Sequence, residues 1–334
     1  MKRMGVCLMG LALLAGAGVW QVNSAESGWT LRRIDAPANL HTGLPADLHF
    51  AATHRVTVAV VDTGILPDTV PGSSRQDGYD FSPGAAGLGQ SSAPLNPHGT
   101  AVAGVVQSVD PGARLLDVRL SDSQGHTTLA RAIDAMRWAA GLEVAGVPLN
   151  RFPAQVINAS FVLKTVPHTG CAPAMQKAVN EILAHGTVIV AGAGNTHAPA
   201  WRNTPAGCQG VISVAATDTQ DRRAPYSDWG GAIALSAPGG TQGEGVDVWW
   251  GAHLSERRGS SFSAPLVAGT VGLLLAQHPD LTPAEVKVIL QRSARPFVGE
   301  SCDPQHRAGC GAGVLDVSAA LRIADSQLAL GGPH

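Results

Sequence analysis

The sequence predicts an α/β fold in which a mostly parallel central sheet carries helices on both faces. From residue 56 onward, segments typical of strands alternate with segments typical of helices, and this alternation favours a parallel sheet. The strand segments are unbroken apolar runs rich in β-branched residues, as expected for strands buried on both faces. The 334 residues are 45% hydrophobic and include 40 Gly and 22 Pro, which suits a compact domain with many tight turns.

The individual elements follow from local patterns. Apolar runs predict strands over 56–62, 114–120, 154–161, 187–191 and 211–216. Apolar residues at helical spacing predict helices over 129–140 and 174–183, and a glycine follows each of them. A capping box at 282–285, with proline at the first helical position, predicts a further helix through residue 290.

The amino terminus has the layout of a secretory signal peptide. Lys2 and Arg3 precede an apolar stretch over 6–20, and small or polar residues follow. We therefore expect a signal peptide over 1–25, an N-terminal approach segment over 26–53, one domain over 54–324 and a C-terminal tail over 325–334. No later segment is expected to be long and apolar enough to span a bilayer. The mature chain is thus predicted to be secreted or periplasmic, without a membrane partner.

Charge and metal-ligand spacing argue against several classes of partner. The formal net charge of −2 gives no electrostatic reason to expect nucleic acid or an anionic membrane. The 12 His show no His-Glu-x-x-His spacing, and no Cys-x-x-Cys pair occurs. We therefore expect no nucleic-acid partner, no metal site and no required cofactor.

The cysteines agree with export. Cys7 lies within the expected signal peptide and would be lost with it, which leaves an even set of Cys171, Cys208, Cys302 and Cys310. Four cysteines allow three pairings. Free buried thiols are the alternative, which an oxidising compartment disfavours.

Three separated segments carry the residue types of nucleophilic catalysis. Ser261 follows a glycine-serine turn and precedes an apolar run with Pro265 in the first helical turn, which places its hydroxyl at a helix N-terminus. Asp62 ends the first buried strand, and His98 begins a helix of small residues. Taken singly, they could be a helix cap, a turn aspartate and a surface histidine. Together they supply a nucleophile, a general base and an orienting carboxylate.

These segments resemble the motifs of the subtilisin-like serine peptidases, which have the same order Asp, His, Ser. The matching segments are Asp62-Thr63-Gly64, His98-Gly99-Thr100, Gly259-Ser260-Ser261 with Ala264-Pro265, and Ala191-Gly192-Ala193-Gly194-Asn195. The resemblance covers nearly all of the chain after the signal peptide and implies a three-layer subtilisin-like fold, with 54–324 as the catalytic domain. It implies that Ser261 attacks, His98 acts as base and then acid, and Asp62 orients the imidazole.

The resemblance implies further site residues. Asn195 would donate its side-chain amide to the oxyanion, beside the backbone N–H of Ser261; a turn asparagine is the alternative. Ser160, Phe161 and Gly192 would contact the substrate. Where relatives usually have Ser-Leu-Gly-Gly, this chain has bulkier residues over 160–163, which puts the specificity pocket and the main-chain pairing with substrate in doubt.

The resemblance also bears on cross-links, metals and loops. It implies the disulfides Cys171–Cys208 and Cys302–Cys310. Structural calcium is common among relatives, but no ligand set can be assigned here, and Asp68 and Asp80 read as solvated loop residues. Glycine-rich loops over 82–95 and 239–258 are expected to rim the cleft, with Trp249 and Trp250 either lining it or packing under a hairpin.

The function predicted is that of a secreted serine endopeptidase that acts on peptide or protein substrates through an acyl-enzyme. The alternative is a catalytically silent relative that binds peptides or partner proteins on the same scaffold. An esterase of the α/β-hydrolase type is disfavoured, because Ser261 lacks the Gly-x-Ser-x-Gly elbow. Many secreted relatives carry a long folding-assistant segment for which residues 26–53 are too few. We therefore expect slow unaided folding or a folding helper supplied in trans.

Overall fold

The computed structural model describes residues 29–36, 55–67, 69, 75–84, 87–88, 96–122, 124–163, 170–251, 253–298, 302–303 and 309–330. The expected signal peptide, most of the approach segment, much of the loop over 82–95, and Asp68 lie outside the described residues. The predictions made for them stay predictions.

An eight-stranded sheet forms the centre of the domain, in the order β3-β2-β4-β1-β5-β6-β7-β8. The strands from β2 to β8 run parallel, and only the short β3 is antiparallel to its neighbour. Their bounds are β1 Thr57–Asp62, β2 Arg75–Asp80, β3 Gly87–Leu88, β4 Arg114–Arg119, β5 Val156–Ala159, β6 Val188–Gly192, β7 Ile212–Thr217 and β8 Ile233–Pro238. This arrangement confirms the predicted mostly parallel sheet.

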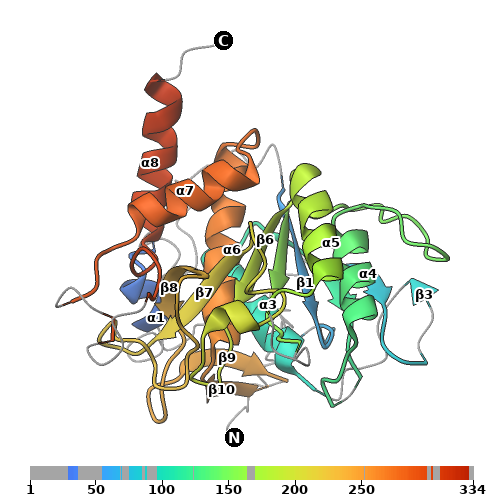
Figure 1. Cartoon of the computed structure of the whole chain (residues 1–334), viewed down its shortest axis with the longest axis horizontal. Helices are drawn as coiled ribbons and strands as arrows, with labels where there is room; N and C mark the ends of the chain where they lie inside the picture. Colours follow the sequence, from blue (N-terminus) through green and yellow to red (C-terminus); the bar gives the residue numbers. More distant parts are fainter. Residues whose placement is uncertain are drawn as a thin grey trace, which may run out of the picture.

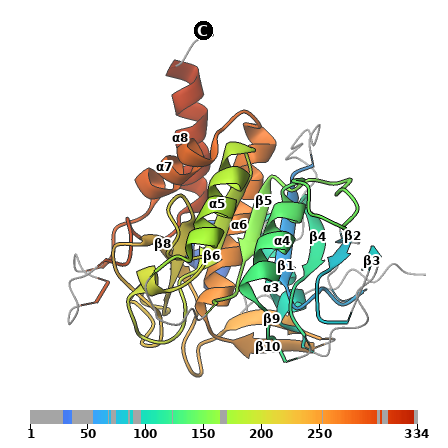
Figure 2. The ribbon, with the colours of Figure 1, turned by 45° about the vertical axis from the view of Figure 1, so that its right-hand side comes forward.

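Helices cover both faces of the sheet (Figures 1 and 2). Val58 and Val60 of β1 pack with α3 (His98–Val109) and α6 (Ser260–Gln277) on one face. The alternate residues Ala59 and Val61 pack with α4 (Leu129–Ala139) and α5 (Pro173–Ala184) on the other. Because successive residues of a strand point to opposite faces, every residue of β1 is buried. The predicted three-layer fold is therefore confirmed.

Helix α6 corrects one prediction. It is 18 residues long with a mean hydropathy of 1.3, so a segment after the expected signal peptide is long and apolar enough to cross a bilayer. However, 83% of it is buried inside the domain, where it contacts α3 and the strands β5 to β8. A helix surrounded by protein is apolar on all sides, so its composition reflects its place in the core.

Several elements were not predicted. A hairpin of β9 (Val246–Trp250) and β10 (His253–Arg257) occupies the segment expected to be a glycine-rich loop. Helices α1 (Trp29–Arg33) and α8 (Val317–Leu330) were not predicted either. Helix α7 (Pro283–Ser293) is the one that the capping box predicts. Helix α8 crosses the boundary expected between domain and tail.

The prediction that Asp80 is a solvated loop residue is wrong. Asp80 ends β2 and is 6% exposed. Its carboxylate accepts a hydrogen bond from the Ser82 N–H at 2.8 Å and lies 3.5 Å from the Arg119 guanidinium. The strand register places Asp80 opposite Arg119 of β4, and this pairing satisfies the buried charge.

The described cysteines form two disulfides, Cys171–Cys208 and Cys302–Cys310, which are the pairs that the resemblance implies. The first bridges 37 residues of sequence and joins the start of α5 to the segment after the short 3₁₀ helix Ala200–Arg202. The second closes a loop of 8 residues.

Helices α3 and α6 approach each other closely at Gly269. A Cβ atom at Gly269 would lie 2.8 Å from the Val106 carbonyl oxygen and 2.8 Å from the Val109 Cβ. Both of these residues belong to α3. Because His98 opens α3 and Ser261 lies in the first turn of α6, this contact helps to set the distance between them.

We predict that Gly269→Ala lowers the free energy of unfolding by about 1–3 kcal/mol, because the added methyl group overpacks the contact. The measurement is the midpoint of urea denaturation. Gly231→Ala is the control, since nothing lies within 4 Å of its added Cβ, and it should change stability by less than about 0.5 kcal/mol. Equal midpoints for the two variants would contradict the close approach.

Candidate active site

Asp62 lies at the carboxyl end of β1, where parallel sheets gather functional groups. Its side chain is 2% exposed. The Oδ1 atom accepts a hydrogen bond from the Thr63 N–H at 2.7 Å and lies 2.8 Å from Nδ1 of His98. Since a carboxylate only accepts hydrogen bonds, the proton of this contact is on Nδ1. The other ring nitrogen of His98, Nε2, is then the one that can accept a proton.

Hydrogen bonds join the turn after β1 to the first turn of α3. The Thr63 hydroxyl donates to the Asn96 carbonyl oxygen and accepts from the Gly99 N–H, each at 2.9 Å. In return, the Leu66 N–H donates to the Thr100 hydroxyl at 2.8 Å. The two threonines of the Asp-Thr-Gly and His-Gly-Thr motifs therefore hold the two segments against each other.

Gly99 is required by how close these segments come. A Cβ atom there would lie 2.5 Å from the Gly64 carbonyl oxygen and 3.2 Å from the Asp62 Cβ. Any larger side chain would push the start of α3 away from the end of β1. Glycine at this position therefore permits the contact between Asp62 and His98.

The surroundings of His98 favour its charged form. Its side chain is 24% exposed. Burial, the largest single effect, lowers the pKa of His98, but the charge of Asp62 and its hydrogen bond outweigh burial, so the pKa is raised from the ordinary value of 6.5. The imidazole ring also lies 5.7 Å from the Phe262 ring, centroid to centroid, next to Ser261 in sequence.

Two hydrogen bonds join Ser261 to Ser160, the residue that follows strand β5. The Ser160 hydroxyl donates to the Ser261 carbonyl oxygen at 2.9 Å, and the Ser261 hydroxyl donates to the Ser160 carbonyl oxygen at 3.3 Å. The buried amide of Asn158 donates to the Ser160 hydroxyl at 2.9 Å. The end of β5 thus fixes the first turn of α6.

Asn195 follows β6 and is oriented by the same helix. Its Oδ1 atom accepts from the Ser260 N–H at 2.9 Å, and the Ser260 hydroxyl accepts from the Gly194 N–H at 3.0 Å. With Oδ1 engaged, the NH₂ group is the donor that Asn195 can offer to a ligand. Asn195 lines a pocket together with Ser261.

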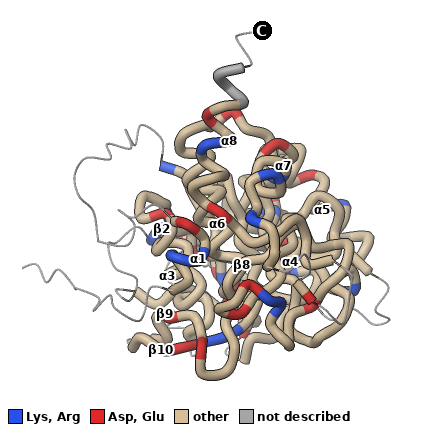
Figure 3. Tube along the Cα trace, turned by 90° about the vertical axis from the view of Figure 1, so that its left-hand side faces the viewer, with Lys and Arg blue, Asp and Glu red and all other residues tan. Residues whose placement is uncertain are grey.

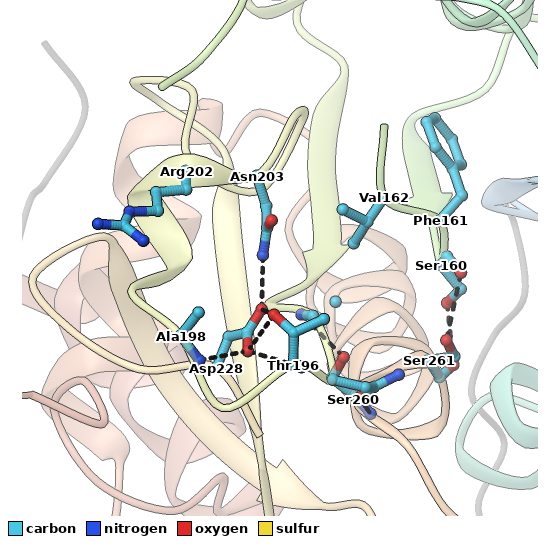
Figure 4. Close-up of a pocket in the computed structure, with 13 residues that line it drawn as sticks. Ser160, Phe161, Val162, Thr196, Ala198, Arg202, Asn203, Asp228, Ser260 and Ser261 are labelled. Carbon is cyan, nitrogen blue, oxygen red and sulfur yellow. Dashed lines mark hydrogen bonds between the residues drawn. The ribbon is translucent and has the colours of Figure 1, made fainter. Parts of the chain in front are cut away.

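This pocket has a volume of about 410 Å³ (Figure 4). Ser160, Phe161 and Gly192, predicted to contact substrate, all line it, and Val162 adds its side chain to the wall. The remaining lining residues are Gly194, Asn195, Thr196, Ala198, Arg202, Asn203, Asp228, Ser260 and Ser261.

Asp228, which the sequence patterns did not single out, organises one side of the pocket. It is fully buried, and its carboxylate accepts hydrogen bonds from the N–H groups of Thr196 and Ala198 at 2.8 and 2.9 Å and from the Asn203 amide at 2.7 Å (Figure 4). With its oxygens engaged in this way, the carboxylate stabilises the loop after Asn195. No local motif marks Asp228 or Asn203, because they meet only in the folded chain.

The two tryptophans belong to strand β9 of the hairpin, and neither is among the residues that line the pocket. Trp249 packs on α3, since a Cβ atom at Gly104 would lie 3.2 Å from its Cδ1. Trp250 stands edge-on to the His98 ring, with centroids 6.5 Å apart and an interplanar angle of 88°. The β9–β10 hairpin therefore packs on the domain and also reaches the candidate site.

Within the described part of the chain, no group of three or more His, Cys, Asp or Glu residues is placed to hold a metal ion. The described residues therefore assign no ligand set to structural calcium.

We predict that Gly99→Ala lowers the pKa of His98, because separation from Asp62 removes both effects that raise it and leaves burial, which lowers it. The measurement is an NMR titration of the His98 ring. Gly231→Ala, at an open turn, is the control and should leave the titration unchanged. An unaltered His98 pKa in a folded Gly99→Ala variant would contradict the role given to this glycine.

Comparison with known proteins identifies the family. Residues 53–313 match the model of the subtilase family. Similar sequences include an extracellular protease of Xanthomonas campestris pv. campestris, 34% identical over 306 residues, and an extracellular basic protease of Dichelobacter nodosus, 30% identical over 312 residues. The alignments cover 80% of this chain but only 51% and 50% of those proteins. The chain thus spans about half the length of these curated relatives.

Solved structures of proteases resemble the fold of this chain. A structure of proteases from Pseudoalteromonas arctica matches with a TM-score of 0.73 at 28% identity, covering 91% of this chain and 96% of that one. A cold-adapted subtilisin-like serine proteinase matches with a TM-score of 0.68 at 25% identity, covering 88% of this chain and 99% of that one. Sequence motifs, fold and site thus lead to one conclusion, that the chain belongs to the subtilase family.

Proposed function

We propose that the chain is a secreted serine endopeptidase that hydrolyses peptide bonds through an acyl-enzyme. The observation that carries this proposal is the 2.8 Å contact of Asp62 with Nδ1 of His98, beside a helix start that bears Ser261. The names of the relatives, which describe extracellular proteases, support both the activity and the export. The substrate class that follows is a peptide or a protein.

In the proposed reaction, Ser261 Oγ bonds to the scissile carbonyl carbon while Nε2 of His98 takes the hydroxyl proton. The Ser261 hydroxyl donates to the Ser160 carbonyl in the structure, so attack requires that it leave this acceptor and donate to Nε2 of His98. Collapse of the tetrahedral intermediate breaks the C–N bond, and His98 gives its proton to the leaving nitrogen. Water then repeats the sequence on the acyl-enzyme, and Asp62 stabilises the imidazolium throughout.

The oxyanion is assigned to two donors, one in the first turn of α6 and one in the loop after β6. One is the backbone N–H of Ser261, in the first turn of a helix whose dipole favours negative charge. The other is the NH₂ group of Asn195, held by the Ser260 N–H at its Oδ1. Donors fixed before the reaction stabilise the developing charge without rearrangement.

We predict that a fluorophosphonate labels the wild-type chain at Ser261 and fails to label His98→Ala, since the serine hydroxyl needs a base to react. Mass spectrometry of the adduct is the measurement. His185→Ala removes an exposed histidine at the C-cap of α5, before the amino end of β6, and should label like wild type. A folded wild-type chain that takes no label would favour the alternative of a silent, peptide-binding scaffold.

We predict that Asn195→Leu and Asn195→Asp each lower kcat by at least about 10²-fold, because both lose the donor to the oxyanion. Asn195→Asp keeps an acceptor for the Ser260 N–H, so its loss cannot come from a displaced helix start alone. Steady-state kinetics on a small peptide give kcat and KM separately, and KM should change little. If Asn195→Asp kept the wild-type kcat, the oxyanion assignment would be wrong.

A further inference from the structure

Three side chains form a row beside the candidate nucleophile: His98, Trp250 and Arg257. Trp250 stands edge-on to the His98 ring, and the Arg257 guanidinium carbon lies 4.3 Å from the centroid of the Trp250 ring. A guanidinium over an indole face is held by a cation–π interaction. The hairpin therefore fixes a positive charge near the proposed general base.

Strand register places this charge apart from the acidic residues of the hairpin. Arg257 pairs with Val246 and His253 pairs with Trp250, so Arg257 and Trp250 share one face of the two strands. Glu256 and its partner Asp247 lie at the alternate positions and point to the other face. Figure 3 shows acidic and basic positions following one another along β10.

The Arg257 guanidinium has no ion pair within the part of the chain that the structure describes. One of its NH groups donates to the Glu256 carbonyl oxygen at 3.1 Å. A guanidinium has five N–H donors in a planar fork that fits a carboxylate. Arg257 is partly exposed, so its remaining donors can reach a ligand.

The row lies next to the proposed general base and takes no part in lining the pocket. The pocket that begins at Ser160 is lined by neither His98, Trp250 nor Arg257. In the proposed mechanism, His98 protonates the leaving nitrogen, so the leaving peptide starts next to the imidazole. A first side chain of that peptide directed along the row would meet Trp250 and then Arg257.

We propose that Arg257, held by Trp250, is a specificity-determining residue that selects substrates with Asp or Glu as the first residue of the leaving peptide. The inference rests on the proposed function and names the substrate class of the same site. The interaction is a charge-assisted hydrogen bond at a partly exposed position. Its effect is therefore moderate and falls as salt screens it.

The test uses three quenched fluorescent peptides that differ only at that first residue, which is Glu, Gln or Lys. We expect wild type to cleave the Glu peptide with a kcat/KM about 5- to 10-fold above that of the Gln peptide, and the ratio to shrink in 1 M salt. Arg257→Gln should bring the Glu-to-Gln ratio close to one, and Arg257→Glu should shift the preference to the Lys peptide.

Arg258→Gln is the matched control. It removes the same charge from the next residue, which is exposed and follows the end of β10, and it should keep the wild-type ratio. Trp250→Leu should reduce the Glu-to-Gln ratio, because the Arg257 guanidinium loses its cation–π contact with the indole ring.

Two results would overturn the inference while leaving the proposed function intact. One is cleavage of the Glu and Gln peptides by wild type at equal rates. The other is an equal loss of preference in Arg258→Gln and Arg257→Gln, which would show an effect of overall charge. If wild type cleaves none of the peptides and takes no fluorophosphonate label, the proposed function fails and this inference fails with it.

Discussion

The site depends on one buried contact, the 2.8 Å approach of the Asp62 carboxylate to Nδ1 of His98. A carboxylate with 2% of its side chain exposed is costly to bury unless donors reach it. The reciprocal hydrogen bonds of Thr63 and Thr100 bring the two segments together, and the absence of a side chain at Gly99 lets them meet. The contact fixes the tautomer of the imidazole and raises its pKa.

The rest of the fold brings the other groups to that contact. A parallel sheet gathers the ends of β1, β5 and β6 at one edge, although they are far apart in sequence. Helix α6 is held against these ends through the hydrogen bonds of Ser160 and Asn195 and against α3 at Gly269. Ser261 lines the pocket that Asp228 organises, and the Trp250–Arg257 pair lies beside His98.

The sequence predicted the parts of this arrangement that leave a local pattern. The strand at 57–62 and the capped helix α7 follow from apolar runs and capping residues, and Asp62, His98, Asn195 and Ser261 follow from short motifs. Strand β2 was missed because its charged residues pair with neighbouring strands, as Arg75 does with Asp117, so no apolar run marks it. The Asp228 and Asn203 contact and the stacking of Arg257 on Trp250 depend on long-range packing and hairpin register, which leave no local signal.

We propose that the contact with Asp62 makes His98 the base of the reaction. The most direct measurement compares two pH titrations of the wild-type chain, the His98 ring by NMR and kcat/KM for a small neutral peptide. Because the neutral imidazole is the active form, kcat/KM should rise with pH through the pKa of His98. We predict that the two titrations share one midpoint above the ordinary value of 6.5. An acid limb that follows a different pKa, or a ring that titrates at or below 6.5, would contradict it.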